Sequence, residues 1–234
     1  RRTPQDFLKK ACAISRQGWG QPAFYNTESI VQELLNAGKS LEDARQGGSS
    51  GCVETGAFGK EAYILTGYLN LPKILELTLF NGIDPMTGKR LGPETGEASS
   101  FSDFDSFYRA YEEQLHYMTD VKVKGNQIIE GLYARYMPVP LLSCLVDDCI
   151  TNGQDYNAGG ARYNTSYIQG VGIGTLTDSL AAIETLVYKE NKFTLPELVA
   201  ALQDNFDGHL RLHHLVREKA PRYGNDDDAA DILM

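Results

Sequence analysis

The chain of 234 residues has little of what several specialised classes of protein require. Its four cysteines are too few for a disulfide framework, and Cys144 and Cys149 are spaced neither as C-x-x-C zinc ligands nor as an iron–sulfur run. The formal net charge of −9 removes the basic face that phosphate binding needs. No apolar run approaches the ~20 residues of a membrane span, and the first residues are not typical of a signal peptide. We therefore predict a cytoplasmic globular protein that binds neither nucleic acid nor membrane.

The composition is that of a folded globular protein. Hydrophobic residues make up 42% of the chain and charged residues 23%, and the length suits one large domain or two small ones. The sequence does not begin with methionine, and residues 227–234 carry no terminating pattern. We expect the chain to be a segment of a longer protein.

Helical patterns alternate with short apolar runs that suit buried strands, which predicts the α/β class. The longest helical pattern runs from Ser102 to about Tyr136, and its stripe of aromatic and apolar side chains predicts core packing. The stripe consists of Phe104, Phe107, Tyr108, Tyr111, Leu115 and Met118. Other helices are expected at about 4–16, 28–37, 41–46, 71–80, 177–189, 195–205 and 209–219, strands at 62–66 and 162–169, and a strand or buried helix at 141–150.

One glycine-rich loop, residues 47–59, carries Cys52 and, two residues later, Glu54. Five glycines in thirteen residues let the backbone enter left-handed conformations and approach other atoms closely. If Val53 is extended, the side chains of Cys52 and Glu54 point to the same side of the chain. A thiolate nucleophile wants a cationic neighbour, whereas a carboxylate raises the pKa of a thiol. The pattern therefore favours chemistry that a neutral thiol can do, such as hydrogen-atom transfer.

Other signals have plainer interpretations. The glycines at 170, 172 and 174 lie between a strand and a helix, but their spacing is not G-x-G-x-x-G, and close packing explains them as well as a nucleotide does. His209 and His213 are four residues apart without the ligands that usually accompany them, so no metal site is expected. Cys12, Cys144 and Cys149 are predicted to be inert core residues.

Four runs of this sequence resemble the glycyl radical enzymes, and they stand in the order of that family. The runs are S-G-C-V-E at 50–54, N-L-P-K-I-L-E at 70–76, D-P-M-T-G at 84–88 and A-P-R-Y-G-N-D-D-D at 220–228. The resemblance implies that residues 1–234 are one segment of the catalytic, pyruvate formate-lyase-like domain. It also implies a ten-stranded α/β barrel with the cysteine loop at its centre. The family's glycyl radical motif, of the R-V-x-G-Y type, is found nowhere in the chain, so the radical-bearing C-terminal domain is expected outside it.

The family resemblance also implies roles. Cys52 is expected to carry the thiyl radical, Glu54 to act as general acid and base with a pKa raised by a dry pocket, and Tyr68 to bind substrate. The cofactor is expected to be a protein glycyl radical outside this chain, installed by a radical SAM iron–sulfur enzyme. The resemblance further implies a homodimer, a small-molecule substrate and an anaerobic bacterial source. The isolated segment is expected to be inactive.

The residue after Cys52 narrows the branch of the family. Formate acetyltransferases have two adjacent cysteines, whereas here the neighbour is Val53. Glycerol and choline enzymes continue with proline after the glutamate, whereas here Thr55 follows. Residues 51–59, with Tyr68 sixteen positions after Cys52, most resemble the branch that dehydrates trans-4-hydroxy-L-proline to 1-pyrroline-5-carboxylate. Glycerol or propanediol dehydration and choline cleavage stay open as alternatives. So do a nucleotide-binding α/β module and an inactive structural segment.

Overall fold

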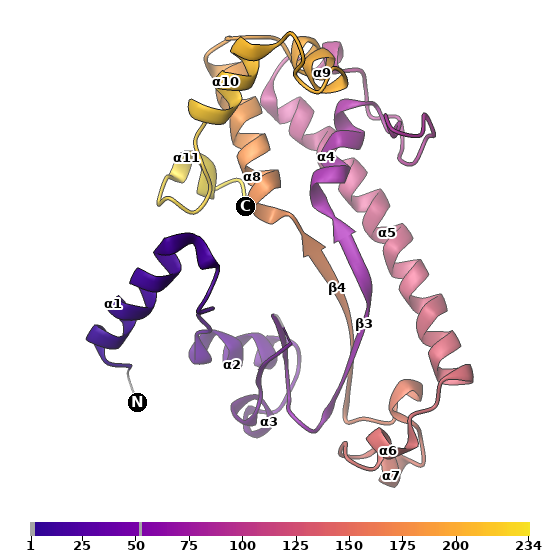
Figure 1. Cartoon of the computed structure of the whole chain (residues 1–234). Coiled ribbons are helices and arrows are strands. Elements are labelled where there is room, and N and C mark those ends of the chain that lie inside the picture. The colour runs from indigo at the N-terminus through magenta and orange to yellow at the C-terminus, as the bar shows by residue number, and fades with distance from the viewer. Residues whose placement is uncertain (1–2, 52) are drawn as a thin grey trace. The chain divides into compact units, whose positions relative to one another are not determined.

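The computed structural model describes residues 3–51 and 53–234 of the protein (Figure 1). The chain divides into two compact units, residues 1–64 with 133–165 and residues 65–132 with 166–234. The first unit contains α1 (Gln5–Ile14), a π-helical turn (Ser15–Trp19), α2 (Thr27–Asn36), α3 (Leu41–Gln46), β1 (Gly48–Ser50), β2 (Glu54–Gly56), α6 (Pro140–Ser143), α7 (Cys149–Asn152) and a 3-10 turn (Tyr156–Ala158). The second contains α4 (Leu71–Leu79), a 3-10 turn (Ala98–Ser100), α8 (Ile173–Ala182), a π-helical turn (Ile183–Lys189), α9 (Leu195–Gln203), α10 (Leu210–Glu218) and α11 (Asp228–Asp231). Strands β3 (Glu61–Asn70) and β4 (Tyr163–Val171) and helix α5 (Phe104–Tyr136) contribute residues to both units.

Short polar side chains begin several helices at or next to the predicted positions. The side chain of Ser40 accepts from the backbone N–H of Asp43 at the start of α3, and Asn70 does the same for Lys73 at the start of α4. Thr194 and Glu197 form a reciprocal capping box on α9. The cap of α2 is Asn26, so this helix begins at Thr27, one residue before the expected start at residue 28. Local side-chain chemistry therefore sets where these helices begin.

Two small sheets organise the strands. β1 and β2 are antiparallel, and β3 pairs with β4. Figure 1 shows β3 and β4 pointing the same way, and each leads directly into a helix, α4 after β3 and α8 after β4. Strand followed by helix, twice, is the α/β pattern that the sequence predicts. The α/β class is confirmed, whereas the described residues form two-stranded sheets and do not by themselves close a barrel.

The core of the second unit forms where α5 packs on α4, α8 and α9. All six residues of the predicted stripe on α5 belong to this core or pack against it. Phe107 is fully buried and meets Phe101 edge to face, with ring centroids 5.6 Å apart. Burial of a side chain such as Phe or Leu contributes about 1.5–3 kcal/mol each. The stripe prediction is confirmed.

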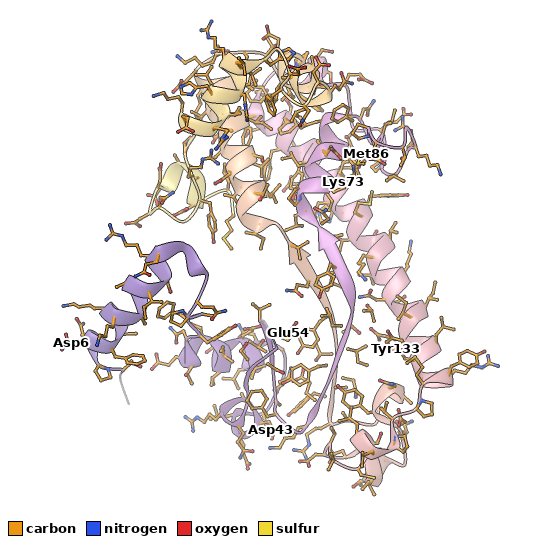
Figure 2. The ribbon with its side chains drawn as sticks, viewed as in Figure 1. Asp6, Asp43, Glu54, Lys73, Met86 and Tyr133 are labelled. Atoms are coloured by element: carbon orange, nitrogen blue, oxygen red, sulfur yellow. The ribbon has the colours of Figure 1, made fainter. Side chains whose placement is uncertain are left out.

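A tight turn follows α4 in the same unit. Lys73 donates to Asp84 over 2.5 Å, and Thr87 donates to the other carboxylate oxygen of Asp84 over 2.6 Å. Both contacts hold down the pKa of Asp84, to about 2. Met86 lies at the exposed end of this turn (Figure 2). The D-P-M-T-G run thus builds a turn fixed by one carboxylate, with an antiparallel bridge between Ile83 and Arg90 at its base.

The prediction of a strand or buried helix over 141–150 is wrong. Two helices of one turn each, α6 and α7, occupy this stretch. Leu141, Leu145 and Ile150 are more than two-thirds exposed. Pro140 and the left-handed conformation of Asp148 interrupt any longer regular element. Helix α8 also begins earlier than expected, because Gly172 (φ +84°) starts it just before Ile173.

Candidate active site

The cysteine loop forms the turn of a short β-hairpin. Gly48 pairs with Gly56, Ser49 with Thr55, and Ser50 with Glu54, so residues 51–53 make the connection. Cys52 lies outside the described residues. Val53 belongs to the turn and is 59% exposed. The expected same-side arrangement of Cys52 and Glu54 involves Cys52 and therefore lies outside the described residues.

The carboxylate of Glu54 folds back over this turn. The backbone N–H of Val53 donates to Oε2 of Glu54 over 3.1 Å. Gly51 has a left-handed backbone (φ +61°), and a Cβ added there would lie 2.6 Å from the same oxygen. The left-handed backbone therefore favours glycine at position 51, and a side chain there would also displace the Glu54 carboxylate. Glu54 is half-buried, which suits a group that exchanges a proton with a substrate.

Behind the hairpin, the buried carboxylate of Glu61 holds the end of β2. Its Oε2 accepts from the backbone N–H of Ala57 over 2.7 Å. Its Oε1 accepts from the hydroxyl of Thr165 over 2.5 Å and lies 3.0 Å from the ammonium of Lys39. A Cβ added to Gly56 would lie 2.6 Å from Oε2, so the carboxylate sits directly against the hairpin backbone. Glu61 is 2% exposed and Lys39 8%, which makes this a buried ion pair.

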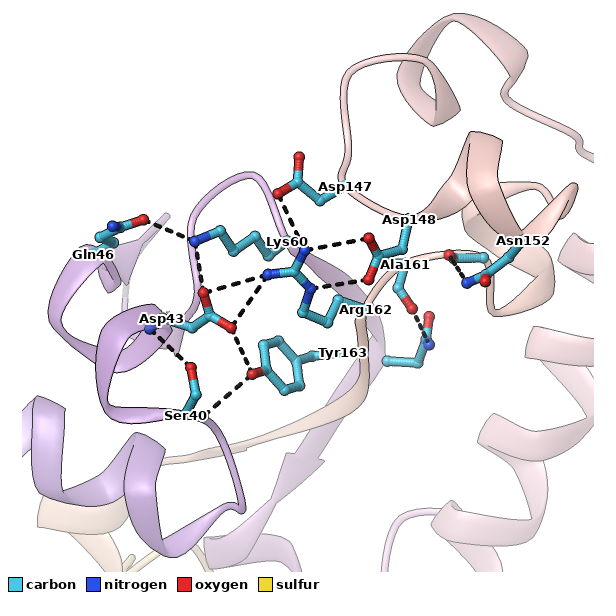
Figure 3. A network of polar contacts seen from close by, with 12 residues as sticks. Ser40, Asp43, Gln46, Lys60, Asp147, Asp148, Asn152, Ala161, Arg162 and Tyr163 are labelled. Atoms are coloured by element: carbon cyan, nitrogen blue, oxygen red, sulfur yellow. Dashed lines mark hydrogen bonds and ion pairs between the residues drawn. The ribbon is translucent and has the colours of Figure 1, made fainter.

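A second carboxylate, Asp43 on α3, gathers polar groups around the loop that follows the hairpin (Figure 3; Figure 2 places Asp43 and Glu54). Lys60 donates to Asp43 over 2.6 Å and the hydroxyl of Tyr163 over 2.7 Å. Arg162 reaches the same carboxylate at 3.4 Å. Hydrogen bonds from Lys60 and Tyr163 hold the pKa of Asp43 well below its usual range. The network joins α3, the loop before β3 and the start of β4.

Arg162 links this network to the segment before α7. Its guanidinium makes two parallel hydrogen bonds to Asp148, of 2.9 and 3.2 Å, and lies 3.6 Å from Asp147. The Arg162 contact lowers the pKa of Asp148. Three carboxylates, of Asp43, Asp147 and Asp148, and one guanidinium thus hold segments that are far apart in the sequence.

We predict that Asp43→Asn lowers the stability of the full-length protein most at neutral pH. Because the folded pKa of Asp43 is depressed, its stabilising share is fully present above the ordinary aspartate pKa of about 3.9 and is lost as pH falls through the folded value. The variant should therefore melt at least about 4 °C below wild type at pH 7, and the gap should narrow below about pH 4. Thermal melts across pH measure this, with exposed Asp120→Asn as the control. A difference in melting temperature that does not change with pH would contradict a stabilising role for the ionised Asp43 carboxylate.

Tyr68 belongs to the second unit, whereas Glu54 belongs to the first. Tyr68 lies near the end of β3 and is 62% exposed, so its ring is free to meet a ligand. Two residues before Tyr68, the backbone carbonyl of Thr66 accepts a hydrogen bond of 3.3 Å from Lys122 of α5. Gly67 has φ +140°, and a Cβ there would lie 3.1 Å from the Lys122 ammonium. The missing side chain of Gly67 lets α5 hold the strand just before Tyr68.

Side chains of α4 fill the space beside two of the glycines that were weighed for nucleotide binding, Gly170 and Gly172. A Cβ added to Gly172 would lie 2.6 Å from the ring of Pro72, and one added to Gly170 would lie 3.3 Å from Leu71. The turn between β4 and α8 therefore packs on the first turn of α4. This accounts for both glycines without a phosphate.

The other residues considered for metal or thiol chemistry are His209 and three cysteines, Cys12, Cys144 and Cys149. No group of three or more His, Cys, Asp or Glu side chains within 3–51 and 53–234 is placed to hold a metal ion. His209 instead lies 3.2 Å from Asp204. Cys149 is buried, and burial raises the pKa of its thiol, as expected of an inert core residue. Cys12 and Cys144 are exposed, so their predicted burial is wrong; both lie on segments whose apolar periodicity is not matched by packing.

A groove of about 750 Å³ lies in the second unit between α4, α8, α9 and α10. Neither Glu54 nor Tyr68 lines it. At its edge Arg222 donates to Asp178 over 2.9 Å, and the backbone N–H of Tyr223 donates to the other oxygen of Asp178 over 2.8 Å. The A-P-R-Y-G run therefore attaches the C-terminal segment to α8.

Among the described helices, none is both long and apolar enough to cross a bilayer.

Sequence reasoning missed two carboxylates near the hairpin: Glu61, which holds the end of β2, and Asp43, which holds the loop that follows it. Asp43 was expected only as part of a helix start, and Glu61, Lys39, Arg162 and Tyr163 were not expected at the site. One signal was present: Glu61 is a charged residue at the head of an otherwise apolar strand. A carboxylate at such a position needs a partner, although the sequence does not say which.

The chain is an α/β protein in which Glu54 lies on a glycine-rich hairpin and follows Cys52 by two residues in the sequence. The chain matches the family model described as "Pyruvate formate lyase-like" over residues 1–234, and it belongs to that family. It is 61% identical over 234 residues to the trans-4-hydroxy-L-proline dehydratase of Clostridioides difficile, covering all of this chain and 30% of that protein.

Solved structures give the same picture. The crystal structure of hydroxyproline dehydratase from Clostridioides difficile with trans-4-hydroxy-L-proline bound matches with a TM-score of 0.90 and 60% identity, over 100% of this chain and 30% of that one. The glycerol-bound B12-independent glycerol dehydratase from Clostridium butyricum matches with a TM-score of 0.84 and 38% identity, over 100% and 29%. A glycyl radical enzyme from Archaeoglobus fulgidus matches with a TM-score of 0.80 and 33% identity, over 98% and 29%. The chain thus spans about a third of the length of the relatives it matches.

Proposed function

We propose that the protein containing this chain is a glycyl radical dehydratase that converts trans-4-hydroxy-L-proline to 1-pyrroline-5-carboxylate and water. The observation that carries the proposal is the 61% identity, over the whole chain, to a dehydratase of that substrate. Cys52 supplies the thiol that the reaction needs, and Glu54, the first residue of β2, supplies the acid.

In the proposed architecture residues 1–234 are one segment of a ten-stranded α/β barrel, with the hairpin at its centre. The radical glycine and part of the substrate pocket lie in other segments of the protein. When installed by a radical SAM enzyme, the glycyl radical supplies a means of oxidising Cys52 to a thiyl. The hairpin fits such a partner, because Gly51 and Val53 at its turn are exposed in this chain. The proposal includes a homodimer in the cytoplasm of an anaerobic bacterium.

In the proposed reaction, Cys52 transfers a hydrogen atom and Glu54 transfers a proton. Cys52, as a thiyl, takes a hydrogen atom from the ring carbon beside the nitrogen. Glu54 gives a proton to the hydroxyl on the next carbon, which leaves as water, and the proton lost from the ring nitrogen replaces it. Cys52 then returns the hydrogen atom to the carbon that carried the hydroxyl. Protonation is required because hydroxide is a poor leaving group, and general acid catalysis of this kind contributes about 10²–10⁴-fold.

Tyr68 takes the role of a substrate contact. Its phenol can donate to a carboxylate or accept from a hydroxyl, and both groups are present on hydroxyproline. A site that excludes water protects the carbon radical from side reactions, which suits a hairpin buried in a barrel.

The competing function within the family is dehydration of glycerol or propanediol. The 38% identity to a glycerol dehydratase keeps this candidate second. An anaerobic panel of hydroxyproline, glycerol, propanediol and choline, run with the full-length protein and its activating enzyme, separates the two. We expect hydroxyproline to be consumed with formation of 1-pyrroline-5-carboxylate, at least about 100-fold faster than the other three, as expected when a polar site is left unmatched. Preferential turnover of glycerol would overturn the substrate assignment.

A further inference from the structure

The contact between Glu61 and the hairpin joins a buried charge to the backbone of the catalytic loop. Ala57, whose N–H donates to Glu61 over 2.7 Å, is the residue directly after β2 and three residues after Glu54. Hydrogen bonds to an ionised acceptor are shorter and roughly twice as strong as neutral ones. The charge-assisted contact therefore adds to the hold on the end of β2, where the sheet itself offers only three paired positions between β1 and β2.

The carboxylate itself is held from two other directions. Lys39, in the turn after α2, brings an ammonium to 3.0 Å, and Thr165 on β4 donates its hydroxyl over 2.5 Å. Lys39 is anchored in turn, since its backbone N–H bonds the carbonyl of Leu34 and its ammonium lies 5.5 Å from the ring centroid of Tyr163. With contacts on both oxygens, the carboxylate has little freedom to rotate.

Neighbouring groups close the space around this anchor. Gly56 leaves room for the carboxylate oxygen at 2.6 Å from where its Cβ would stand. Burial, and then the charge of Glu61, raises the pKa of Tyr63 to about 12, so this phenol stays neutral beside the carboxylate. A movement of Glu61 would therefore be transmitted to the backbone at Gly56 and Ala57 rather than absorbed by empty space.

We propose that Glu61 is a positioning residue for the cysteine hairpin. Its buried carboxylate, held by Lys39, fixes the end of β2 and through it the placement of Glu54 and of the turn that contains Cys52. The proposal rests on the proposed function for the reaction that the hairpin performs. It differs from a purely stabilising ion pair, because it places the effect on the hydrogen-abstraction step.

The test uses the activated full-length protein with Glu61→Gln and the matched control Glu42→Gln, an exposed glutamate on α3. Misplacement of a reacting group by about 1 Å costs up to about 100-fold in rate, so we expect turnover per radical to fall about 10–100-fold in Glu61→Gln and to stay unchanged in the control. The deuterium isotope effect, measured with substrate labelled at the carbon beside the nitrogen, should rise because abstraction becomes slower than the other steps. KM should change less than threefold.

A merely structural role predicts a different outcome. It lowers turnover in proportion to the folded fraction and leaves both the isotope effect and turnover per radical as in wild type, which would overturn the proposal. The double variant Lys39→Met with Glu61→Gln provides rescue. A neutral amide can accept from Ala57 and donate to Thr165 without facing an ammonium, so the double variant should recover at least about tenfold of the lost turnover.

Amide hydrogen exchange of residues 53–57 gives a readout that needs no turnover. We expect exchange at the Ala57 amide to accelerate at least about tenfold in Glu61→Gln and to be unchanged in Glu42→Gln. If wild type does not dehydrate hydroxyproline, the proposed function fails while the exchange experiment still tests the anchor. Unchanged exchange at Ala57 together with wild-type turnover per radical in Glu61→Gln would contradict the positioning role of Glu61 and leave the proposed function intact.

Discussion

Replacing Cys52 with serine in the full-length protein should abolish turnover and leave the glycyl radical intact. The O–H bond of serine is too strong for a glycyl radical to break, so no hydrogen-abstracting group forms on the hairpin. Serine is nearly isosteric with cysteine, and the variant keeps both the left-handed backbone of Gly51 and the contact between Val53 and Glu54. We expect a loss of at least about 10⁴-fold, the scale seen when the reacting atom itself is removed.

Two measurements on the same sample decide this prediction. Electron paramagnetic resonance counts the glycyl radical, and product formation from hydroxyproline is then expressed per radical. The control is Cys12→Ser, since Cys12 is an exposed free thiol and should be dispensable. Turnover per radical that survives in Cys52→Ser would show that the sulfur does not carry the hydrogen atom. An equal loss in Cys12→Ser would instead indicate a general sensitivity to cysteine replacement.

The local parts of this structure could be predicted from the sequence because they depend on neighbouring residues. Ser40, Asn70 and Thr194 each cap a helix within three residues of their own position. The stripe on α5 repeats at the helical period over four turns, and its burial follows from that period. Local hydrogen bonds and periodicity leave a clear record in the order of residues.

Packing between distant segments leaves no such record. The apolar run around Leu141 and Leu145 has the composition of a core element, yet among residues 3–51 and 53–234 no neighbouring segment covers it enough to bury it. Conversely, Glu61 is buried because Lys39 and Thr165 reach it from other parts of the fold. Exposure and burial of these residues depend on partners that the sequence does not pair.

The candidate site shows the same division. Glycines, a lone cysteine and a nearby glutamate identify the hairpin, because that combination is unusual within thirteen residues. The anchors Asp43 and Glu61 escape detection, since acidic residues are common and most of them are solvated. The lowered pKa of Asp43 and the deep burial of Glu61 follow from surrounding donors that only the fold brings together.

Replacing Glu54 with glutamine should leave the hairpin and the radical in place and remove the acid. The amide oxygen of glutamine can still accept from the N–H of Val53, the 3.1 Å contact that holds the side chain over the turn. An amide has no acidic proton to give to the leaving hydroxyl, so turnover on hydroxyproline should fall about 10²–10⁴-fold. KM should change little, because the loss falls on the step in which the hydroxyl departs.

The pH profile distinguishes loss of the acid from loss of geometry. In wild type, turnover per radical should decline at high pH as Glu54 loses its proton, and Glu54→Gln should lack that decline because its residual rate needs no such proton. The matched control is Glu33→Gln, whose carboxylate accepts a 2.7 Å hydrogen bond from Thr55 on the same hairpin but has no role in the reaction. We expect the control to retain the wild-type profile within a few-fold in rate. If Glu54→Gln keeps the high-pH decline, another group supplies the proton and Glu54 serves only to orient the substrate.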